Sequence, residues 1–161
     1  MIKTLAQAVV PFFFFKAPLT KITNQNLQKT INQLKQAPSA EAATKQALEI
    51  LKAKYDSGTV RTYFFFWMAT QSDPNVLWDR KGFMHCTQQN HLLRLLLVKS
   101  EQVEERDIRL GYSLIWYISI HQYLKITLEK DRTVGVDPWS YGRGAKWNEF
   151  ASGFTLKSIS S

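Results

Sequence analysis

The most apolar run of the sequence is HLLRLLLVKS at residues 91–100, and it constrains the fold more than any other segment. Its leucines and valine occupy most of the circumference of a helix rather than one stripe. A helix that is apolar on nearly every side is buried in the middle of a domain, because a surface position would expose part of it to water. Other elements must therefore surround it. The polar segment KSEQVEERD, at residues 99–107, then returns the chain to solvent.

Two helices are predicted before this run, between residues 26 and 54. Leu27, Ile31 and Leu34 recur at spacings of four and three, as apolar residues do along one face of a helix. The segment APSAEAA interrupts that pattern, and Ser39 within it is typical of a helix N-cap. Gly58 is expected to end the second helix. These two helices would form a scaffold around the central one.

From residue 108 onward the periodicity changes from that of a helix to that of a strand. Apolar side chains occupy the even positions of residues 108–118 and most even positions of residues 120–128, and Val134 and Val136 continue the pattern. Such alternation is typical of strands with one buried face. With EKDR as the turn before the last strand, the predicted fold class is α+β: N-terminal helices, and a central helix packed on an antiparallel β-meander.

Two aromatic-rich segments and one loop complete the pattern. VRTYFFFWMAT, at residues 60–70, is too uniformly apolar for periodicity to distinguish a helix from a strand, so both stay open. QSDPNVLWDRKGF, at residues 71–83, is predicted to be a loop, because Asp-Pro-Asn and Gly82 favour turns. We interpret Phe12–Phe15 and Phe64–Trp67 as core packing, with a protein interface as the alternative.

The N-terminus resembles a signal peptide only in outline. Lys3 and an apolar middle fit one, but Gln7 and Pro11 interrupt the middle, Lys16 closes it, and no small-residue cleavage site follows. The segment is also far shorter than the roughly 20 apolar residues of a membrane-spanning helix. We interpret Val9–Phe15 as an apolar arm packed on the domain, with export as the alternative. A lone free thiol fits a cytoplasmic protein, which is the default expectation.

The composition fits one globular domain of 161 residues, of which 45% are hydrophobic. The formal charge of +8 invites a nucleic-acid partner, but Lys and Arg are scattered, with no basic stripe interleaved with aromatics. We therefore expect a solvated basic surface and no nucleic-acid partner. A single cysteine excludes a disulfide within the chain and a cysteine-rich zinc site. His85, His91 and His121 lack metal-ligand spacing, so neither a metal nor a cofactor is expected.

The only cysteine, Cys86, falls where the loop is expected to become the central helix. Unpaired N–H groups at a helix N-terminus stabilise a thiolate, and a histidine oriented by a carboxylate would complete the nucleophile. His121 projects from the odd face of its strand, opposite the apolar face, and Asp137 has the same parity. With a hairpin centred on Lys130, Asp137 lies across from Tyr123 and diagonal to His121, within reach of its ring.

These residues carry a resemblance to a known family. GFMHCTQQNHLLRLLL, HQYLKI and VGVDPW resemble the nucleophile segment, the histidine strand and the aspartate strand of the transglutaminase-like core of papain-like cysteine enzymes. That family orders its triad Cys, His, Asp, and the intervals here are 35 and then 16 positions. The resemblance covers about residues 76–139. It implies a single transglutaminase-like domain, with residues 1–75 as a helical N-terminal part and residues 140–161 as a C-terminal tail or flap.

The resemblance implies thiol-dependent acyl chemistry on the amide bonds of a protein or peptide substrate. The chain would be a cysteine protease or amidase, or a transglutaminase-type acyltransferase. Cys86 would attack the carbonyl carbon, His121 would take the thiol proton, and Asp137 would orient the imidazole. The oxyanion would bind the backbone N–H of Cys86, with Trp78 or Gln71 as a candidate second donor. His85 is expected to point elsewhere, because it is adjacent to the cysteine at a helix start, and His91 is expected to form hydrogen bonds within the protein, so neither receives a role.

Two other functions stay open. CTQQN, at residues 86–90, resembles the nucleophile segment of the arylamine N-acetyltransferases, which use the same triad order. Those enzymes need further domains for their acyl donor, however, and only 24 residues follow Asp137. The second alternative is a non-catalytic transglutaminase-like binding module, whose aromatic clusters would form a protein interface. The sequence leaves the substrate, the acyl acceptor and the oligomeric state open.

Overall fold

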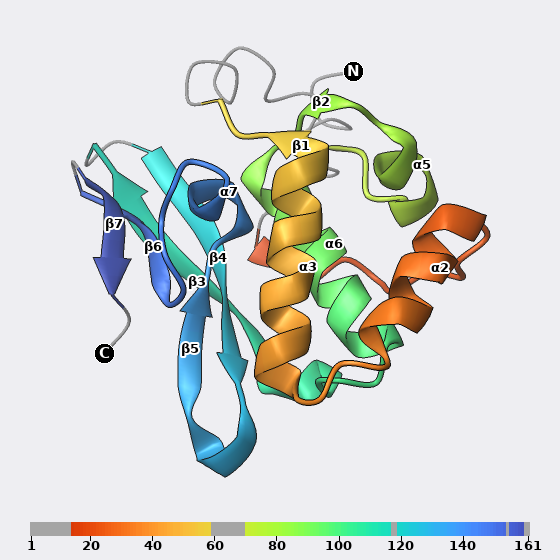
Figure 1. Cartoon of the computed structure of the whole chain (residues 1–161). Coiled ribbons are helices and arrows are strands. Elements are labelled where there is room, and N and C mark those ends of the chain that lie inside the picture. Colours follow the sequence, from red (N-terminus) through yellow and green to blue (C-terminus); the bar gives the residue numbers. More distant parts are fainter. Residues whose placement is uncertain (1–13, 59–69, 117–118, 154, 160–161) are drawn as a thin grey trace.

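The computed structural model describes residues 14–58, 70–116, 119–153 and 155–159. Most of the helices gather on one side of the molecule, and the longer strands lie on the other (Figure 1). The α-helices of the described ranges are α2 (Gln25–Leu34), α3 (Ala40–Lys54), α5 (Pro74–Asp79), α6 (Cys86–Lys99) and α7 (Pro138–Tyr141). The strands there are β1 (Tyr55–Asp56), β2 (Gly82–Phe83), β3 (Ile108–Ile115), β4 (Ser119–Thr127), β5 (Thr133–Val136), β6 (Glu149–Ser152) and β7 (Thr155–Ile159). The predicted α+β class is confirmed.

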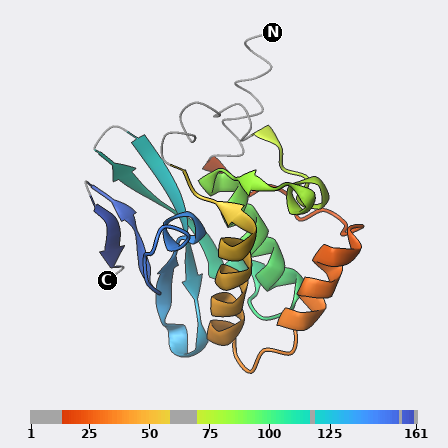
Figure 2. The ribbon, with the colours of Figure 1, turned by 45° about the horizontal axis from the view of Figure 1, so that its top comes forward.

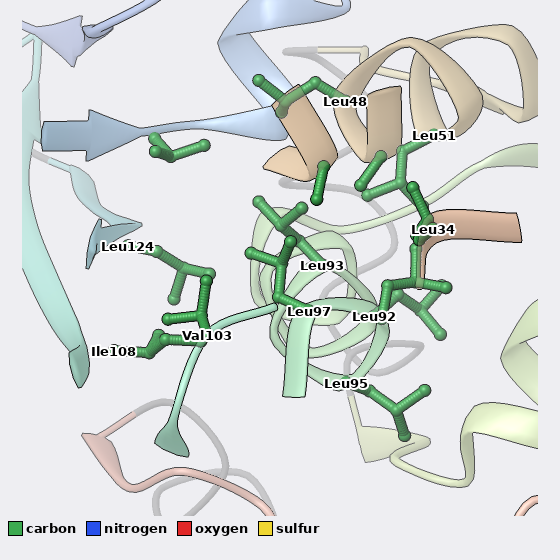
Figure 3. Packing of buried hydrophobic residues seen from close by; sticks show 14 of the residues in the cluster. Leu34, Leu48, Leu51, Leu92, Leu93, Leu95, Leu97, Val103, Ile108 and Leu124 are labelled. Carbon is green, nitrogen blue, oxygen red and sulfur yellow. The ribbon is translucent and has the colours of Figure 1, made fainter. Parts of the chain in front are cut away.

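Helix α6 is the centre of the hydrophobic core, as its apolar run predicts. Every residue from Cys86 to Leu97 is buried. Leu93 and Leu97 lie between the sheet, on the side of Leu124, and helix α3, on the side of Leu48 (Figure 3). Fully burying one leucine side chain contributes roughly 1.5–3 kcal/mol. Packing on several sides therefore fixes the position of α6, and with it the position of its first residue.

Helices α2 and α3 cover α6, and both predicted helices are confirmed. The side chain of Asn24 accepts the N–H of Leu27 at 3.0 Å, and that of Ser39 accepts the N–H of Ala42 at 3.1 Å. Each bond satisfies one of the backbone donors that the first turn of a helix leaves unpaired. The prediction of Ser39 as an N-cap is therefore correct.

The end of α3 differs from the prediction. The helix stops at Lys54, not near Gly58, because Tyr55 begins strand β1. This strand pairs in parallel with β2, with Tyr55 opposite Gly82. The hydroxyl of Tyr55 also donates to the buried carbonyl of Leu77 at 3.0 Å. A tertiary contact thus ends the helix before its local stop signal.

The segment 71–83 is not the plain loop that was predicted, because it contains α5. Asp73 is the N-cap, and its side chain accepts the N–H of Asn75 at 2.9 Å. Pro74 occupies the first helical position, where its missing N–H costs nothing. The Asp-Pro pair that we interpreted as a turn signal is equally a signal for a helix start.

Strands β3, β4 and β5 form an antiparallel sheet in the predicted order. Leu124 pairs with Val136, so the hairpin is centred on Lys130 as expected. The apolar even face is only partly covered. Its residues nearest α6 are buried, whereas four further along are 39–48% exposed, namely Tyr112, Leu114, Trp116 and Ile120. The alternation therefore continues beyond the area that the helices shield.

The described residues after Asp137 pack on the sheet rather than trailing from it (Figure 2). The ring of Tyr123 in β4 stacks on that of Phe150 in β6, with centroids 4.1 Å apart and planes 8° apart. The hydroxyl of Ser113 donates to the carbonyl of Ala151 at 2.5 Å. Neither a surface tail nor a loose flap describes this part of residues 140–161.

The N-terminal arm is described only from Phe14 onward, so the expectation for residues 9–13 lies outside the described residues. Phe14 and Phe15 are 49% and 69% exposed, so the interpretation of this cluster as core packing is wrong for these two residues. Lys16 then anchors the chain, donating to the carbonyl of Ile108 at 2.8 Å. Residues 60–69 also lie outside the described part, so the choice between a helix and a strand for this segment stays a prediction. No helix in the described ranges is long and apolar enough to cross a bilayer.

Candidate active site

Cys86 is the first residue of α6, at the boundary where the sequence places it. The backbone of His85 before it is extended, and the carbonyl of His85 accepts the N–H groups of Gln88 and Gln89 at 3.1 and 3.0 Å. These two bonds begin the helix. Cys86 therefore sits at the positive end of the helix dipole, where a thiolate is stabilised. The residue is 3% exposed.

His121 and Asp137 meet beside this helix start. Nε2 of His121, in β4, lies 2.6 Å from Oδ2 of Asp137, the residue that follows β5. Both residues are buried, at 3% and 2% exposure. His121 also interacts electrostatically with the thiol of Cys86, and since Nε2 is engaged with the carboxylate, Nδ1 is the ring nitrogen left to face the sulfur. The structure thus brings together the three residues that the sequence analysis singled out.

The segment after β5 holds the carboxylate of Asp137 in place. Its Oδ1 accepts the N–H of Ser140 at 3.1 Å, which caps the short helix α7, and its Oδ2 accepts the N–H of Ala151 at 3.0 Å. A buried carboxylate is tolerated only when hydrogen bonds and an opposite charge replace its water. Asp137 has both, with His121 as the cationic partner.

Apolar residues enclose the thiol. Cys86 shares a buried cluster with Ile115, Trp139 and Ala151. The indole of Trp139 lies 5.2 Å from the His121 ring, centroid to centroid. Its Nε1 is buried and has no hydrogen-bond partner among the described residues. Trp139 therefore shields the His121–Asp137 bond and also carries an unused donor next to the nucleophile.

The surroundings shift the pKa of each member of this group. Burial raises the pKa of the Cys86 thiol, but the charge on His85 and the hydrogen bonds with His121 and His85 outweigh it and lower that pKa to about 5. Burial lowers the pKa of His121, yet the charge and hydrogen bond of Asp137 raise it to about 10. The pKa of Asp137 is lowered, because the His121 charge outweighs burial. A thiolate–imidazolium pair is the form favoured at neutral pH.

His85 is a member of the site that the sequence analysis missed. Its Nδ1 is 3.6 Å from Sγ of Cys86 and 3.2 Å from Oγ1 of Thr87. A residue adjacent to the cysteine was expected to point elsewhere, but its extended backbone turns the ring back over the helix start. The available signal was a histidine at an N-cap, where small polar residues are preferred.

The two candidate oxyanion side chains lie elsewhere in the structure. Trp78 is part of the main core rather than of the Cys86 cluster, with the ammonium of Lys54 4.8 Å from its ring. The amide oxygen of Gln71 accepts the N–H of Asp73 at 2.9 Å, in the turn before α5. Trp139 is the indole that lies beside the thiol.

His91, the third histidine, forms hydrogen bonds inside the protein, as predicted. Its Nδ1 lies 3.4 Å from a guanidinium nitrogen of Arg94. Burial, and secondarily the charge of Arg94, lower the pKa of His91 to about 4, so it is neutral at neutral pH. It belongs to a structural polar group on α6 and not to the Cys86 site.

No protein-family model, no curated protein and no solved structure matches this chain. The described residues also contain no group of three or more His, Cys, Asp and Glu side chains arranged to hold a metal ion. The arrangement can supply a buried thiolate, an imidazolium locked by a carboxylate and unpaired N–H donors. These are the parts required for covalent acyl chemistry through sulfur.

Proposed function

We propose that this protein performs thiol-dependent acyl chemistry on amide bonds, as a peptidase or amidase or as a transglutaminase-type acyltransferase. One observation carries the proposal. The imidazole that bonds to the Asp137 carboxylate at 2.6 Å also interacts electrostatically with the only thiol, which belongs to the first residue of a buried helix. The transglutaminase-like resemblance of residues 76–139 supports the same chemistry.

The reaction begins with the thiolate of Cys86 attacking the carbonyl carbon of the amide. A C–S bond forms, and the π electrons move to the oxygen, giving a tetrahedral oxyanion. The backbone N–H of Cys86 is a candidate donor, because the first N–H groups of a helix have no intrahelical partner. The indole Nε1–H of Trp139 is the candidate second donor, in place of Trp78 and Gln71. The C–N bond then breaks, and the amine leaves with a proton from a protonated imidazole beside the thiol; the water or amine that attacks next gives that imidazole a proton in return.

The acyl group now sits on Cys86 as a thioester. Attack by water releases a carboxylic acid, and attack by an amine forms a new amide; in both cases sulfur leaves as the thiolate. Asp137 keeps the His121 imidazole in one orientation throughout. We propose a protein or peptide as the acyl donor. The transglutaminase-like resemblance of residues 76–139 is what supports this class of substrate.

The test is alkylation of the thiol by iodoacetamide between pH 4 and pH 9, with Cys86→Ser as the blank and His121→Ala as the comparison. We expect the wild-type rate to follow an apparent pKa near 5, and that of His121→Ala to move toward the ordinary value of about 8.5. Acylation by p-nitrophenyl acetate, giving a thioester that hydroxylamine cleaves, would then show turnover-competent chemistry.

A wild-type rate that rises only near pH 8.5 would overturn the proposal. So would a thiol that remains unreactive until the protein unfolds. The non-catalytic binding module would then be the better description, because that function needs the fold but no activated sulfur.

A further inference from the structure

His85 occupies the N-cap of α6, a position at which an imidazole does little for the helix. Ser, Thr, Asp and Asn are favoured there because their side-chain oxygens accept a backbone N–H. Helices α2, α3, α5 and α7 all begin with such a bond. The side chain of His85 makes no capping bond. Helix stability therefore does not account for the residue at this position.

The ring of His85 faces the nucleophile instead. Its Nδ1 lies 3.6 Å from Sγ of Cys86 and 3.2 Å from the hydroxyl of Thr87. The residue is 7% exposed, so water screens these contacts little. The hydroxyl of Thr87 can donate to Nδ1 when this nitrogen is unprotonated, and it can accept from Nδ1 when the nitrogen carries a proton. This surrounding suits a ring that changes its protonation state.

The two imidazoles on the thiol differ in how firmly they hold a proton. His121 is bonded to the Asp137 carboxylate at 2.6 Å, a charge-assisted bond that favours the imidazolium strongly. The partners of His85 are the thiol and a neutral hydroxyl. Burial lowers the pKa of His85, the thiolate of Cys86 raises it, and the charge of His121 lowers it, with a net upward shift. A group that titrates nearer neutral pH transfers protons more efficiently than one locked in an ion pair.

We propose that His85 is a second catalytic histidine, which gives a proton to the leaving amine and takes one from the acyl acceptor while His121 stays paired with Asp137. This inference rests on the proposed thiol chemistry and divides it between two imidazoles. His121 maintains the thiolate, and His85 moves protons.

Protonated His85 donates to the nitrogen as the C–N bond of the tetrahedral intermediate breaks, leaving the thioester, a neutral amine and neutral His85. Neutral His85 then takes a proton from water as its oxygen bonds to the thioester carbon. The C–S bond breaks, its electron pair stays on sulfur, and the carboxylic acid leaves. Cys86 is again a thiolate and His85 is again protonated.

The test compares wild type with His85→Asn, His121→Ala and the double variant. Asparagine is a favoured N-cap, so His85→Asn should melt at the same temperature as wild type or higher. His85→Ser, a second capping residue, keeps the test decisive if the Asn variant is unstable. His91→Asn is the control, since it removes the other histidine of α6 away from the thiol.

We expect iodoacetamide alkylation of His85→Asn to follow an apparent pKa about one unit above the wild-type value of about 5, hence about tenfold slower labelling at pH 4 and about twofold slower labelling at pH 6. The Cys86 thiol of His121→Ala should keep an apparent pKa below about 8.5, and the thiol of the double variant should reach that value. After loading with p-nitrophenyl acetate, whose leaving group needs no proton, the thioester of His85→Asn should hydrolyse about 10²-fold more slowly.

Alkylation and thioester hydrolysis of His85→Asn that match wild type would overturn the role of His85 and leave the proposed function intact. A wild-type thiol that reacts only near pH 8.5 would instead remove the proposed function itself. Slower alkylation or thioester hydrolysis of His91→Asn, at an unchanged melting temperature, would also contradict the role of His85. The effect would then not be specific to the imidazole beside the thiol.

Discussion

Three hydrogen bonds converge on one side chain, that of Asp137. Oδ2 accepts from Nε2 of His121 and from the N–H of Ala151, and Oδ1 accepts from the N–H of Ser140. Two oxygens are needed to accept all three. The charge on the carboxylate is also what keeps the buried imidazole of His121 protonated. A single residue therefore both anchors the chain locally and sets the electrostatics of the thiol.

Replacing Asp137 by Asn should weaken the protein and slow its chemistry. An amide has one oxygen, so one buried donor faces an NH₂ group, which costs about 1–3 kcal/mol of unfolding free energy. The imidazolium of His121 loses its counter-charge, and any acyl turnover should fall about 10²–10⁴-fold. Urea unfolding and p-nitrophenyl acetate turnover measure the two effects.

Asp131→Asn is the matched control, because Asp131 is exposed and has a positive φ of 58°, which asparagine also tolerates. The free energy of unfolding and the p-nitrophenyl acetate turnover should both stay at the wild-type level in Asp131→Asn. An Asp137→Asn protein with wild-type turnover would contradict the role assigned to the carboxylate.

At the level of elements, the packing of β6 against the sheet depends on a glycine. Gly111 in β3 pairs with Tyr123 in β4, and the Tyr123 ring lies over it, stacked on Phe150 of β6. A Cβ on Gly111 would lie 2.5–2.9 Å from three atoms of that ring. The absent side chain thus makes room for the stack that holds β6, and β6 carries the Ala151 N–H to Asp137.

Gly111→Ala should therefore destabilise the protein by about 1–3 kcal/mol, the usual cost of overpacking. It should also slow thiol alkylation at pH 6, because displacing the ring moves β6 and loosens Asp137. Urea unfolding and iodoacetamide labelling measure both effects. Arg109→Ala, at an exposed position two residues earlier in β3, should change stability by less than about 0.5 kcal/mol. Equal stabilities for the two variants would refute the packing argument.

The elements also show what the sequence could predict. The parity of His121 and Asp137, with a hairpin centred on Lys130, predicted that their side chains meet, since alternation and turn position determine register. Helix α5 was missed because Asp-Pro is compatible with both a turn and a helix start. The Ala151 N–H could not be predicted, because a backbone donor belongs to every residue type and only tertiary packing selects one.

Choosing between similar side chains also needed the three-dimensional structure. The sequence contains several tryptophans, and Trp78 was the indole considered for the site, whereas Trp139 lies beside Cys86. Burial in the main core and burial at the site look alike in a sequence. His85 was missed for a related reason, because only the extended backbone before α6 shows where its ring points.

For the whole molecule, the lowered pKa of Cys86 links stability to pH. The folded thiol titrates near pH 5, and the unfolded one near 8.5. A depressed pKa contributes stability that is fully present above the unfolded value and is lost as the pH falls toward the folded value. Between about pH 5 and pH 8.5 the unfolded chain holds one more proton at this residue.

The stability advantage of wild type over Cys86→Ser should therefore grow as the pH rises from about 5 to about 8.5, by up to about 1.4 kcal/mol per pH unit. Serine does not titrate in this range, so packing differences shift the two curves by a constant amount. Urea unfolding at pH 5.5, 7 and 8.5 measures the difference. Parallel curves for the two proteins would mean either that the folded thiol keeps an ordinary pKa or that the proton it loses is held by His85.

The bond from Ala151 to Asp137 has a consequence for synthesis on the ribosome. Cys86 leaves the ribosome long before Ala151 has been added to the chain. The carboxylate of Asp137 lacks one of its hydrogen bonds until the N–H of Ala151 is present. A nascent chain therefore carries its thiol with an ordinary, mostly protonated character while other nascent and folding proteins surround it. We therefore expect the thiol to acquire its lowered pKa only after strand β6 has packed on the sheet, so the folding of residues 149–152 determines when Cys86 is activated.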